Sequence, residues 1–294
     1  MYGGLVGCVK RSATHQCDIA REWCVPLALH TPYFTDLWSN IVQYIDFNCD
    51  LGEIEGIAGE TLDAQMMTHV SSINVACGGH AGDTDRIRKV VRWAIELNVA
   101  IGAHPGYADR ANFGRIVVPM SPAKILTLVS QQIQIVADIA EELGGKLHHV
   151  KPHGALYNLA ATSPETALAI AAAVKNIAPS CLLVGLSGSC STAAAASVGL
   201  NPVHEIFADR NYMADGTLVP RNEPQAVLHD AAEIAARAVS IIHTGRVTAI
   251  DGTPLSLQFD TICIHSDTAN TVAIAAEIRR VFAEQNIAVR AVAS

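Results

Sequence analysis

The chain has 294 residues, of which 50% are hydrophobic and 16% are charged, and its formal net charge is -8. This length suffices for one large α/β domain or two small ones, and the composition excludes an intrinsically disordered chain. The negative charge without Lys/Arg-rich runs argues against nucleic acid as a partner, and no apolar run reaches the roughly 18 residues that a membrane span needs.

Residues 1–44 lack the regular pattern of the rest, and we interpret them as an N-terminal extension outside a single domain of residues 45–294. Basic residues between positions 10 and 21 suggest a transit peptide, whereas Asp18, Glu22 and the missing amphipathic pattern argue against one. The eight cysteines include no C-x-x-C pair, which argues against a thiolate zinc site. They are scattered through a large chain without a secretory hydrophobic region, which argues against a disulfide framework. We therefore expect a reducing, cytoplasmic compartment.

From Ile45 onward, apolar strands alternate with amphipathic helices. Strands are expected at 45–50, 72–77, 99–103, 147–150, 182–186, 203–208 and 261–264, with a weaker candidate at 288–292. Helices are expected at 62–70, 84–95, 122–143, from 163, at 192–198, 223–243 and 270–285. Apolar strands separated by helices predict a parallel sheet with both faces covered.

Polar residues follow nearly every predicted strand. They are Asp50, Glu53, His80, Asp83, His104, Asp109, Lys151, His153, Asp209, Arg210, His265 and Asp267. A lone Asp or His at a strand end is most often a cap or a hydrogen-bonded loop residue, but the recurrence favours a shared site. An open doubly wound sheet also fits the alternation. A closed barrel would bring all strand ends to one rim, so we predict an irregular (β/α) barrel of seven or eight strands.

Two groups at this rim suggest chemistry. Asp50, His80 and His104 could bind a divalent metal through one oxygen and two imidazole nitrogens, with His153 as a fourth candidate; the alternative is that they hydrogen-bond one another or the substrate. Lys151 could polarise a carbonyl, hold a phosphate or act as a base, with either a lowered pKa or an anionic partner; the alternative is a lysine paired with one of the rim aspartates in a partly structural role.

Other motifs limit the choice of chemistry. Arg115, Arg210 and Arg221 are suited to gripping a carboxylate or a phosphate at two points. The chain contains no G-x-x-x-x-G-K-[ST] loop, no G-x-G-x-x-G fingerprint after the first strand and no G-x-S-x-G elbow. A nucleotide cradle of the usual kind and a serine triad are therefore not expected.

Five motifs resemble those of the LamB/YcsF family: FNCDLGE (47–53), NVACGGHAGD (74–83), GAHPGY (102–107), KPHGALYN (151–158) and FADR (207–210). The resemblance runs in order from about Ile45 to the end. The chain departs from the family pattern at Gly79, where Phe is usual, at Ala108, where Pro is usual, and at Ser266, where Gly is usual. Loss of the Phe at position 79 could widen the pocket.

The resemblance implies an irregular barrel of the glycoside hydrolase/deacetylase type and ATP-dependent opening of 5-oxo-L-proline to L-glutamate. It further implies that this chain is the A subunit of a multi-subunit 5-oxoprolinase, with ATP handled by partner subunits of the B and C types. A homo-oligomer is left open. The alternatives are a stand-alone metal-dependent amidase or deacetylase acting on a small lactam or carbohydrate amide, and a non-catalytic lactam- or sugar-binding subunit.

With this resemblance the site residues divide into three sets. The catalytic residues are Asp50, His80, Lys151 and His153. The substrate-binding residues are Asn48, His104, Asp209, Arg210, His265 and Asp267, with Arg210 as the natural partner of the substrate carboxylate. A divalent metal, if bound, would be held by Asp50, His80 and His104.

Overall fold

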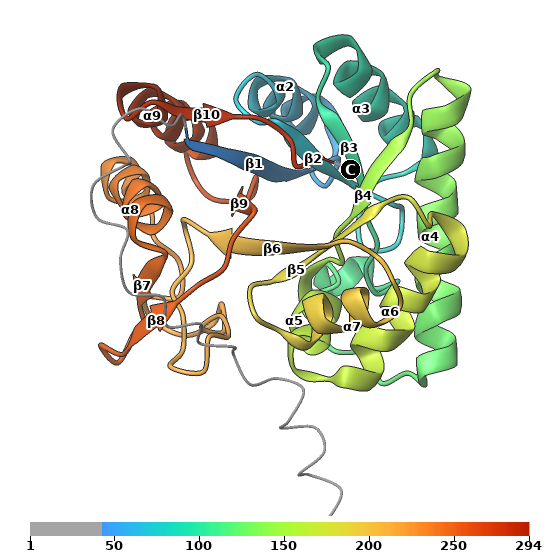
Figure 1. Cartoon of the computed structure of the whole chain (residues 1–294). Coiled ribbons are helices and arrows are strands. Elements are labelled where there is room, and N and C mark those ends of the chain that lie inside the picture. The colour runs from blue at the N-terminus through green and yellow to red at the C-terminus, as the bar shows by residue number, and fades with distance from the viewer. Residues whose placement is uncertain (1–42, 294) are drawn as a thin grey trace, which may run out of the picture.

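The computed structural model describes residues 43–293 and shows a closed parallel barrel surrounded by helices (Figure 1). Its strands are β1 (Gln43–Leu51), β2 (Ser72–Ala76), β3 (Ala100–His104), β4 (Leu147–Val150), β5 (Leu182–Leu186), β6 (Pro202–Phe207) and β9 (Thr261–Ile264). Pairing of β1 with β9, in the register Asp46 to Thr261, closes the ring. This closure confirms the predicted barrel and rules out the open sheet.

One short strand makes the barrel irregular. β10 (Ile287–Val289) pairs in parallel with the first residues of β1, in the register Gln43 to Ile287, whereas the later residues of β1 pair with β9. The strand expected at 288–292 therefore exists, but it lies beside the entry of β1 and does not become an eighth member of the ring.

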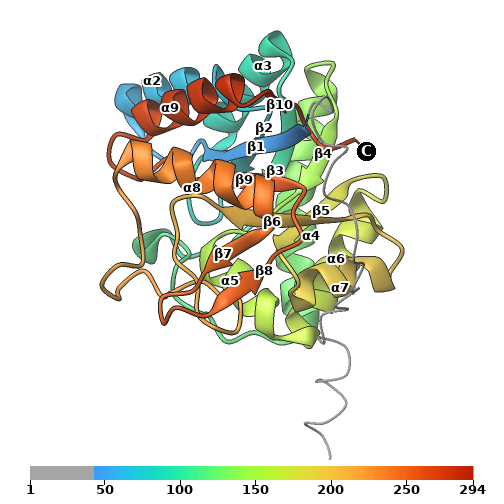
Figure 2. The same cartoon turned by 60° about the vertical axis from the view of Figure 1, so that its left-hand side comes forward.

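Eight helices of the described chain flank the barrel (Figures 1 and 2). They are α2 (Gly56–Met67), α3 (Thr84–Leu97), α4 (Pro122–Glu142), α5 (Gly154–Thr162), α6 (Pro164–Ile177), α7 (Cys190–Ser197), α8 (Ala231–Thr244) and α9 (Thr271–Glu284). Side chains cap several of them; Ser121, for example, accepts from the Lys124 N–H, with Pro122 in the first turn. None of these helices combines the length and apolar character that crossing a membrane requires.

The interior of the barrel contains many polar side chains beside a small apolar cluster of Leu182, Val184 and Val203. The main hydrophobic core lies between the strands and the helices. Along β1 the alternation is strict: Phe47 faces outward and packs edge-on against Phe282 of α9, with 6.4 Å between ring centroids. Asn48 faces inward and donates across the barrel to Glu205 Oε1 at 2.9 Å. A closed barrel with a polar interior provides rigid positions for charged side chains at its carboxyl-terminal rim.

Four local features differ from the expectations. The helix expected at 62–70 begins earlier and ends earlier, as α2 at Gly56–Met67. The helix expected at 223–243 begins at Ala231, because residues before it form an irregular segment with a bridge between Arg210 and Val227. Helix α5 was not predicted, nor was the hairpin of β7 (Arg246–Thr248) and β8 (Pro254–Ser256), which forms a separate sheet (Figure 2). Apart from its last two residues, the proposed extension at 1–44 lies outside the described residues and stays a prediction.

Candidate active site

A cavity of about 600 Å³ opens at the carboxyl-terminal rim of the barrel. Among the residues that line it are Asp50, His104, Arg115, Lys151, His153, Tyr157, Phe207, Arg210, Arg221 and His265. Asn48, Glu53, His80, Asp209 and Asp267 contact lining residues without lining the cavity themselves. All ten residues that the sequence analysis assigned to the site therefore lie at this rim or directly beneath it.

Lys151 is the buried cation at the floor of the cavity. Its Nζ lies 2.9 Å from Asp50 Oδ1 and 2.9 Å from Glu205 Oε1. Although burial lowers the pKa of Lys151, these two carboxylates raise it well above its usual value. Of the two sequence-based alternatives for this residue, an anionic partner is therefore the one observed. A lysine held as an ammonium stabilises negative charge and does not act as a base.

Asp50 links Lys151 to the histidines. Its second oxygen, Oδ2, lies 3.4 Å from His104 Nε2, and its Oδ1 also accepts from the Asn74 amide at 2.8 Å. Burial raises the pKa of Asp50, but the His104 and Lys151 charges lower it well below its usual value. Asp50 is therefore a carboxylate with one oxygen bound to the ammonium and the other directed at an imidazole.

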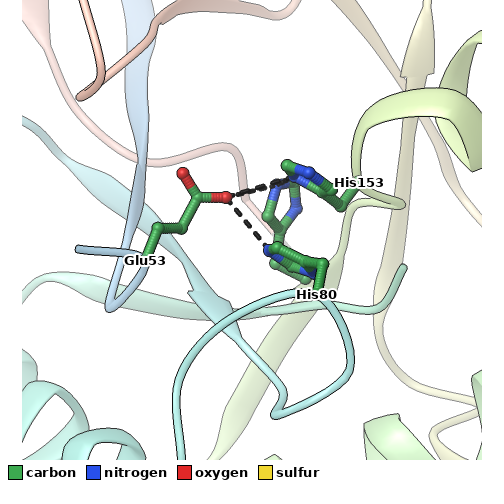
Figure 3. A group of neighbouring side chains, drawn as sticks. Glu53, His80 and His153 are labelled. Atoms are coloured by element: carbon green, nitrogen blue, oxygen red, sulfur yellow. Dashed lines mark hydrogen bonds and ion pairs between the residues drawn. The ribbon is translucent and has the colours of Figure 1, made fainter. Parts of the chain in front are cut away.

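Glu53 lies beside three imidazoles, and Figure 3 shows its contacts with two of them, those of His80 and His153. Its Oε1 lies 3.1 Å from His80 Nε2, 3.1 Å from His153 Nδ1 and 3.8 Å from His104 Nε2. The rings of His80 and His153 stack in parallel, with centroids 3.6 Å apart. All four side chains are buried. Burial would raise the pKa of Glu53, but hydrogen bonds with His153 and His80 lower it below its usual range.

Two backbone carbonyls determine which ring nitrogens carry protons in this cluster. His104 Nδ1 donates to the Lys151 carbonyl at 2.7 Å, and His153 Nε2 donates to the Phe113 carbonyl at 2.8 Å. In the neutral rings the lone pairs are then on His104 Nε2 and His153 Nδ1, which lie 3.0 Å apart. Lone pairs that face one another and a carboxylate repel unless a proton or a cation lies among them.

The cluster of Glu53, His80, His104 and His153 therefore suits a divalent metal. Each residue offers one ligand atom, and these atoms lie within 4.8 Å of one another. Nitrogen and oxygen donors of this kind bind zinc and similar ions, and metal-bound histidines usually donate their other N–H to a carbonyl or carboxylate. The sequence-based metal set was Asp50, His80 and His104, with His153 as a fourth candidate. The cluster contains these three histidines, and Glu53 stands in it where Asp50 was expected.

The other predicted residues have varied surroundings. Asp209 accepts from His265 Nδ1 at 3.0 Å and is fully buried. Arg210 lines the cavity, but its Nε and one terminal nitrogen donate to the carbonyls of Ala226 and Val219. Asp83 and Asp109 accept from backbone N–H groups as caps, which is the ordinary role of a lone strand-end aspartate.

Sequence reasoning missed Glu205 and Asn74. Both are completely buried and face the barrel interior, where Asn74 donates to Asn48 and Asp50 at 2.8 Å. The available signal was a polar residue inside an otherwise apolar strand, as in PVHEIF for β6. The sequence analysis considered only residues at the strand ends and therefore did not include these two. Only the closed barrel brings their positions close to Lys151.

Gly79 is not among the residues that line the cavity, and the expected widening at this position stays a prediction. A Cβ at Gly79 would lie 2.7 Å from Gln132 Oε1. The buried Gln132 fills this space and bonds both the N–H and the carbonyl of Gly106, at 3.0 and 2.7 Å. The hydroxyl of Ser266 is buried without a hydrogen-bond partner in the described chain.

Comparisons with known proteins agree on one family. The LamB/YcsF family model matches residues 45–294. The chain is 47% identical to the A subunit of 5-oxoprolinase from Nitrobacter hamburgensis, over 83% of this chain and 96% of that protein. It is 43% identical to the protein of the same name in Heliobacterium modesticaldum, over 84% and 97%. The crystal structure of a lactam utilization protein from Thermus thermophilus has a TM-score of 0.79 and 39% identity, covering 85% of this chain and all of that one.

Proposed function

The chain belongs to the LamB/YcsF family, and from this we propose that it is the A subunit of a multi-subunit 5-oxoprolinase, hydrolysing 5-oxo-L-proline to L-glutamate with consumption of ATP. The names of its relatives support a lactam substrate. The single structural observation that supports it most is the ammonium of Lys151, which is held at the cavity floor between Asp50 and Glu205.

The chemistry requires charge stabilisation at one oxygen. When water adds to the lactam carbonyl carbon, negative charge develops on the carbonyl oxygen, and the ring opens as the C–N bond breaks and the nitrogen takes a proton. Lys151 supplies a fixed positive charge for the developing oxyanion. We assign to Asp50, whose Oδ2 is not bound to the Lys151 ammonium, the transfer of a proton from the water to the leaving nitrogen.

ATP would act by activating the amide. An unstrained lactam is a poor electrophile, and transfer of the γ-phosphoryl group from ATP to its oxygen makes the ring carbon more electrophilic and releases ADP. Water then adds to this carbon, the C–N bond breaks as the nitrogen takes a proton, and a second water hydrolyses the resulting acyl phosphate to L-glutamate and phosphate. Because the chain has no phosphate-cradle motif, we assign nucleotide binding to partner subunits of the B and C types. A cavity of about 600 Å³ leaves room beside a small lactam for a phosphoryl group.

We also propose that Glu53, His80, His104 and His153 hold a divalent cation. A bound cation would act as a Lewis acid toward water or the carbonyl oxygen. The facing lone pairs of His104 and His153 support this proposal. We expect the purified chain to contain stoichiometric metal, the Glu53→Gln variant to lose it and the Glu60→Gln variant to keep it. Metal-free protein after growth and purification with divalent ions would contradict the proposal. Glu60 is a partly exposed carboxylate on α2.

Reconstitution tests the proposed reaction. Glutamate formation from 5-oxo-L-proline is measured with the chain alone and with B and C subunits, each with and without ATP and chelator. Glutamate only with the partners and ATP is expected. Activity of the chain alone without ATP would select the stand-alone metal-dependent amidase or deacetylase. Tight lactam binding without turnover under all conditions would select a non-catalytic binding subunit.

A further inference from the structure

Two arginines from different loops share one carboxylate beside the cavity. Arg115 follows β3, Arg221 follows β6 and Asp267 follows β9. One terminal nitrogen of Arg115 pairs with Asp267 Oδ2, and Arg221 lies 3.6 Å from Asp267 Oδ1. Both guanidinium groups line the cavity, and their side chains remain 36% and 28% exposed. Asp267 thus holds two cations side by side while leaving them accessible to a ligand.

Arg115 is fixed to the clustered histidines through Phe113. Its guanidinium carbon lies 4.8 Å from the Phe113 ring centroid, a distance at which the ring face attracts a cation. The Phe113 ring in turn contacts the His153 ring edge-on at 5.4 Å, and the Phe113 carbonyl accepts from His153 Nε2. The position of Arg115 is therefore set relative to the floor of the cavity.

Arg221 is positioned by Arg210. The buried Arg210 guanidinium donates to the carbonyls of Val219 and Ala226, at 2.5 and 3.2 Å, which lie on either side of Arg221 in the chain. These bonds hold the ends of the 219–226 segment together. Burial and then the Arg221 charge lower the pKa of Arg210 to about 10, which agrees with two guanidinium groups lying near one another.

Three arginines and three aspartates lie at this side of the cavity. Arg115, Arg210 and Arg221 line it together with Asp215. The aspartates have partners of their own: Asp215 accepts from Thr217, Asp267 is shared by two arginines, and Asp209 is bonded to His265. Each guanidinium has five N–H donors, and Asp267 satisfies one donor of Arg115 and makes only an ion pair with Arg221. An anionic ligand group would find both charge and free donors here.

We propose that Arg115 and Arg221 together bind the carboxylate of an acidic lactam and direct its ring toward Lys151, so that this pair selects 5-oxo-L-proline over uncharged lactams. The proposal rests on the proposed function and deepens it by assigning substrate selection to two named residues. Arg210, which the sequence analysis expected to bind the substrate carboxylate, instead positions the loop that contains Arg221.

Calorimetric titration of the full chain tests this selection without turnover. The probes are 5-oxo-L-proline, 2-pyrrolidinone, which has the same ring without the carboxylate, and inorganic phosphate. Wild-type protein should bind 5-oxo-L-proline at least about tenfold more tightly than 2-pyrrolidinone. Arg115→Gln and Arg221→Gln should each lower the affinity for 5-oxo-L-proline about tenfold or more and leave the affinity for 2-pyrrolidinone unchanged. Arg221→Lys should recover part of the loss, since it keeps the charge without the fork of donors.

The control is Arg88→Gln, which removes a similarly exposed arginine that also pairs with a carboxylate, Glu142, away from this cavity. It should bind all probes like the wild type. Three results would each overturn the proposal. They are equal affinities of the wild type for the two lactams, undetectable binding of 5-oxo-L-proline, and variants in which only the affinity for phosphate is lowered. Failure of the proposed function would be distinguishable, because it would appear as carboxylate-dependent binding without glutamate formation in the reconstituted system.

Discussion

Replacing Lys151 with methionine should destabilise the folded protein strongly, because it leaves two buried carboxylates without their cation. Lys151 is 2% exposed, and Asp50 and Glu205 each lie 2.9 Å from its Nζ. Removing one partner of a buried ion pair lowers the free energy of unfolding by roughly 3–5 kcal/mol, since the remaining charge stays desolvated. Methionine has a similar length, so the change removes charge with little change of volume.

A second substitution distinguishes lost charge compensation from lost packing. In Lys151→Met/Glu205→Gln one of the two stranded charges is neutralised, and the Gln oxygen can still accept from Asn48, which donates to Glu205 at 2.9 Å. The double variant should therefore be more stable than Lys151→Met alone, with an interaction energy of roughly 1–3 kcal/mol. The matched control is Lys89→Met, which removes the partly exposed Lys89–Glu60 pair on α3 and α2 and should change stability by less than about 1 kcal/mol.

Urea unfolding at pH 7, followed by circular dichroism, measures all these variants. A loss in Lys151→Met no larger than that in Lys89→Met would refute the reasoning, as would a double variant that is less stable than the single one. The first result would mean that the carboxylates do not need the ammonium, and the second that Glu205 stabilises the fold without it.

Two further substitutions test the histidine cluster and the space beside Gly79. Burial lowers the pKa of His80 from 6.5 to about 4, so at pH 5 the unfolded chain binds a proton at this residue and the folded chain does not. The free energy of unfolding should therefore fall by about 2 kcal/mol from pH 7 to pH 5 through this group. In urea unfolding with chelator, the free energy of unfolding of His80→Gln should depend less steeply on pH than that of the wild type, and an equal dependence would contradict the prediction. Gly79→Ala should lower the free energy of unfolding by about 1–3 kcal/mol by displacing Gln132 from Gly106, and thermal denaturation should show no such loss in a Gln132→Ala background.

The strand-and-helix alternation predicted a parallel sheet covered by helices, and the polar residues that follow the strands favoured a closed barrel over an open sheet. It failed where tertiary contacts override local signals. Glu223 and Pro224 resemble a helix start, yet the segment is held in an irregular form by the Arg210 side chain, and α8 begins at Ala231. Helix α5 begins at Gly154, with a φ of 53°, directly after His153, and the Pro and Gly there are typical of a loop.

The site was predictable as a set of strand-end residues but not as a set of contacts. Closure of the barrel brings Asp50 and Lys151 together from strands that are not neighbours, and it places Glu205 beneath them. Spacing along the chain contains no information on which carboxylate meets which imidazole. For this reason Glu53 was recognised at the rim but not as the centre of the histidine cluster.

The most direct test of the proposed reaction compares two aspartates of β1 in the reconstituted 5-oxoprolinase assay. Asp50 lines the cavity and contacts Lys151, whereas Asp46 is equally buried, at 5% exposure, and bonds Ser72 and Thr261 toward the other end of the strand. With B and C subunits and ATP, Asp50→Asn should abolish glutamate formation, and Asp46→Asn should retain it in proportion to its folded fraction. Wild-type turnover by folded Asp50→Asn would contradict the assignment of lactam hydrolysis to this cavity.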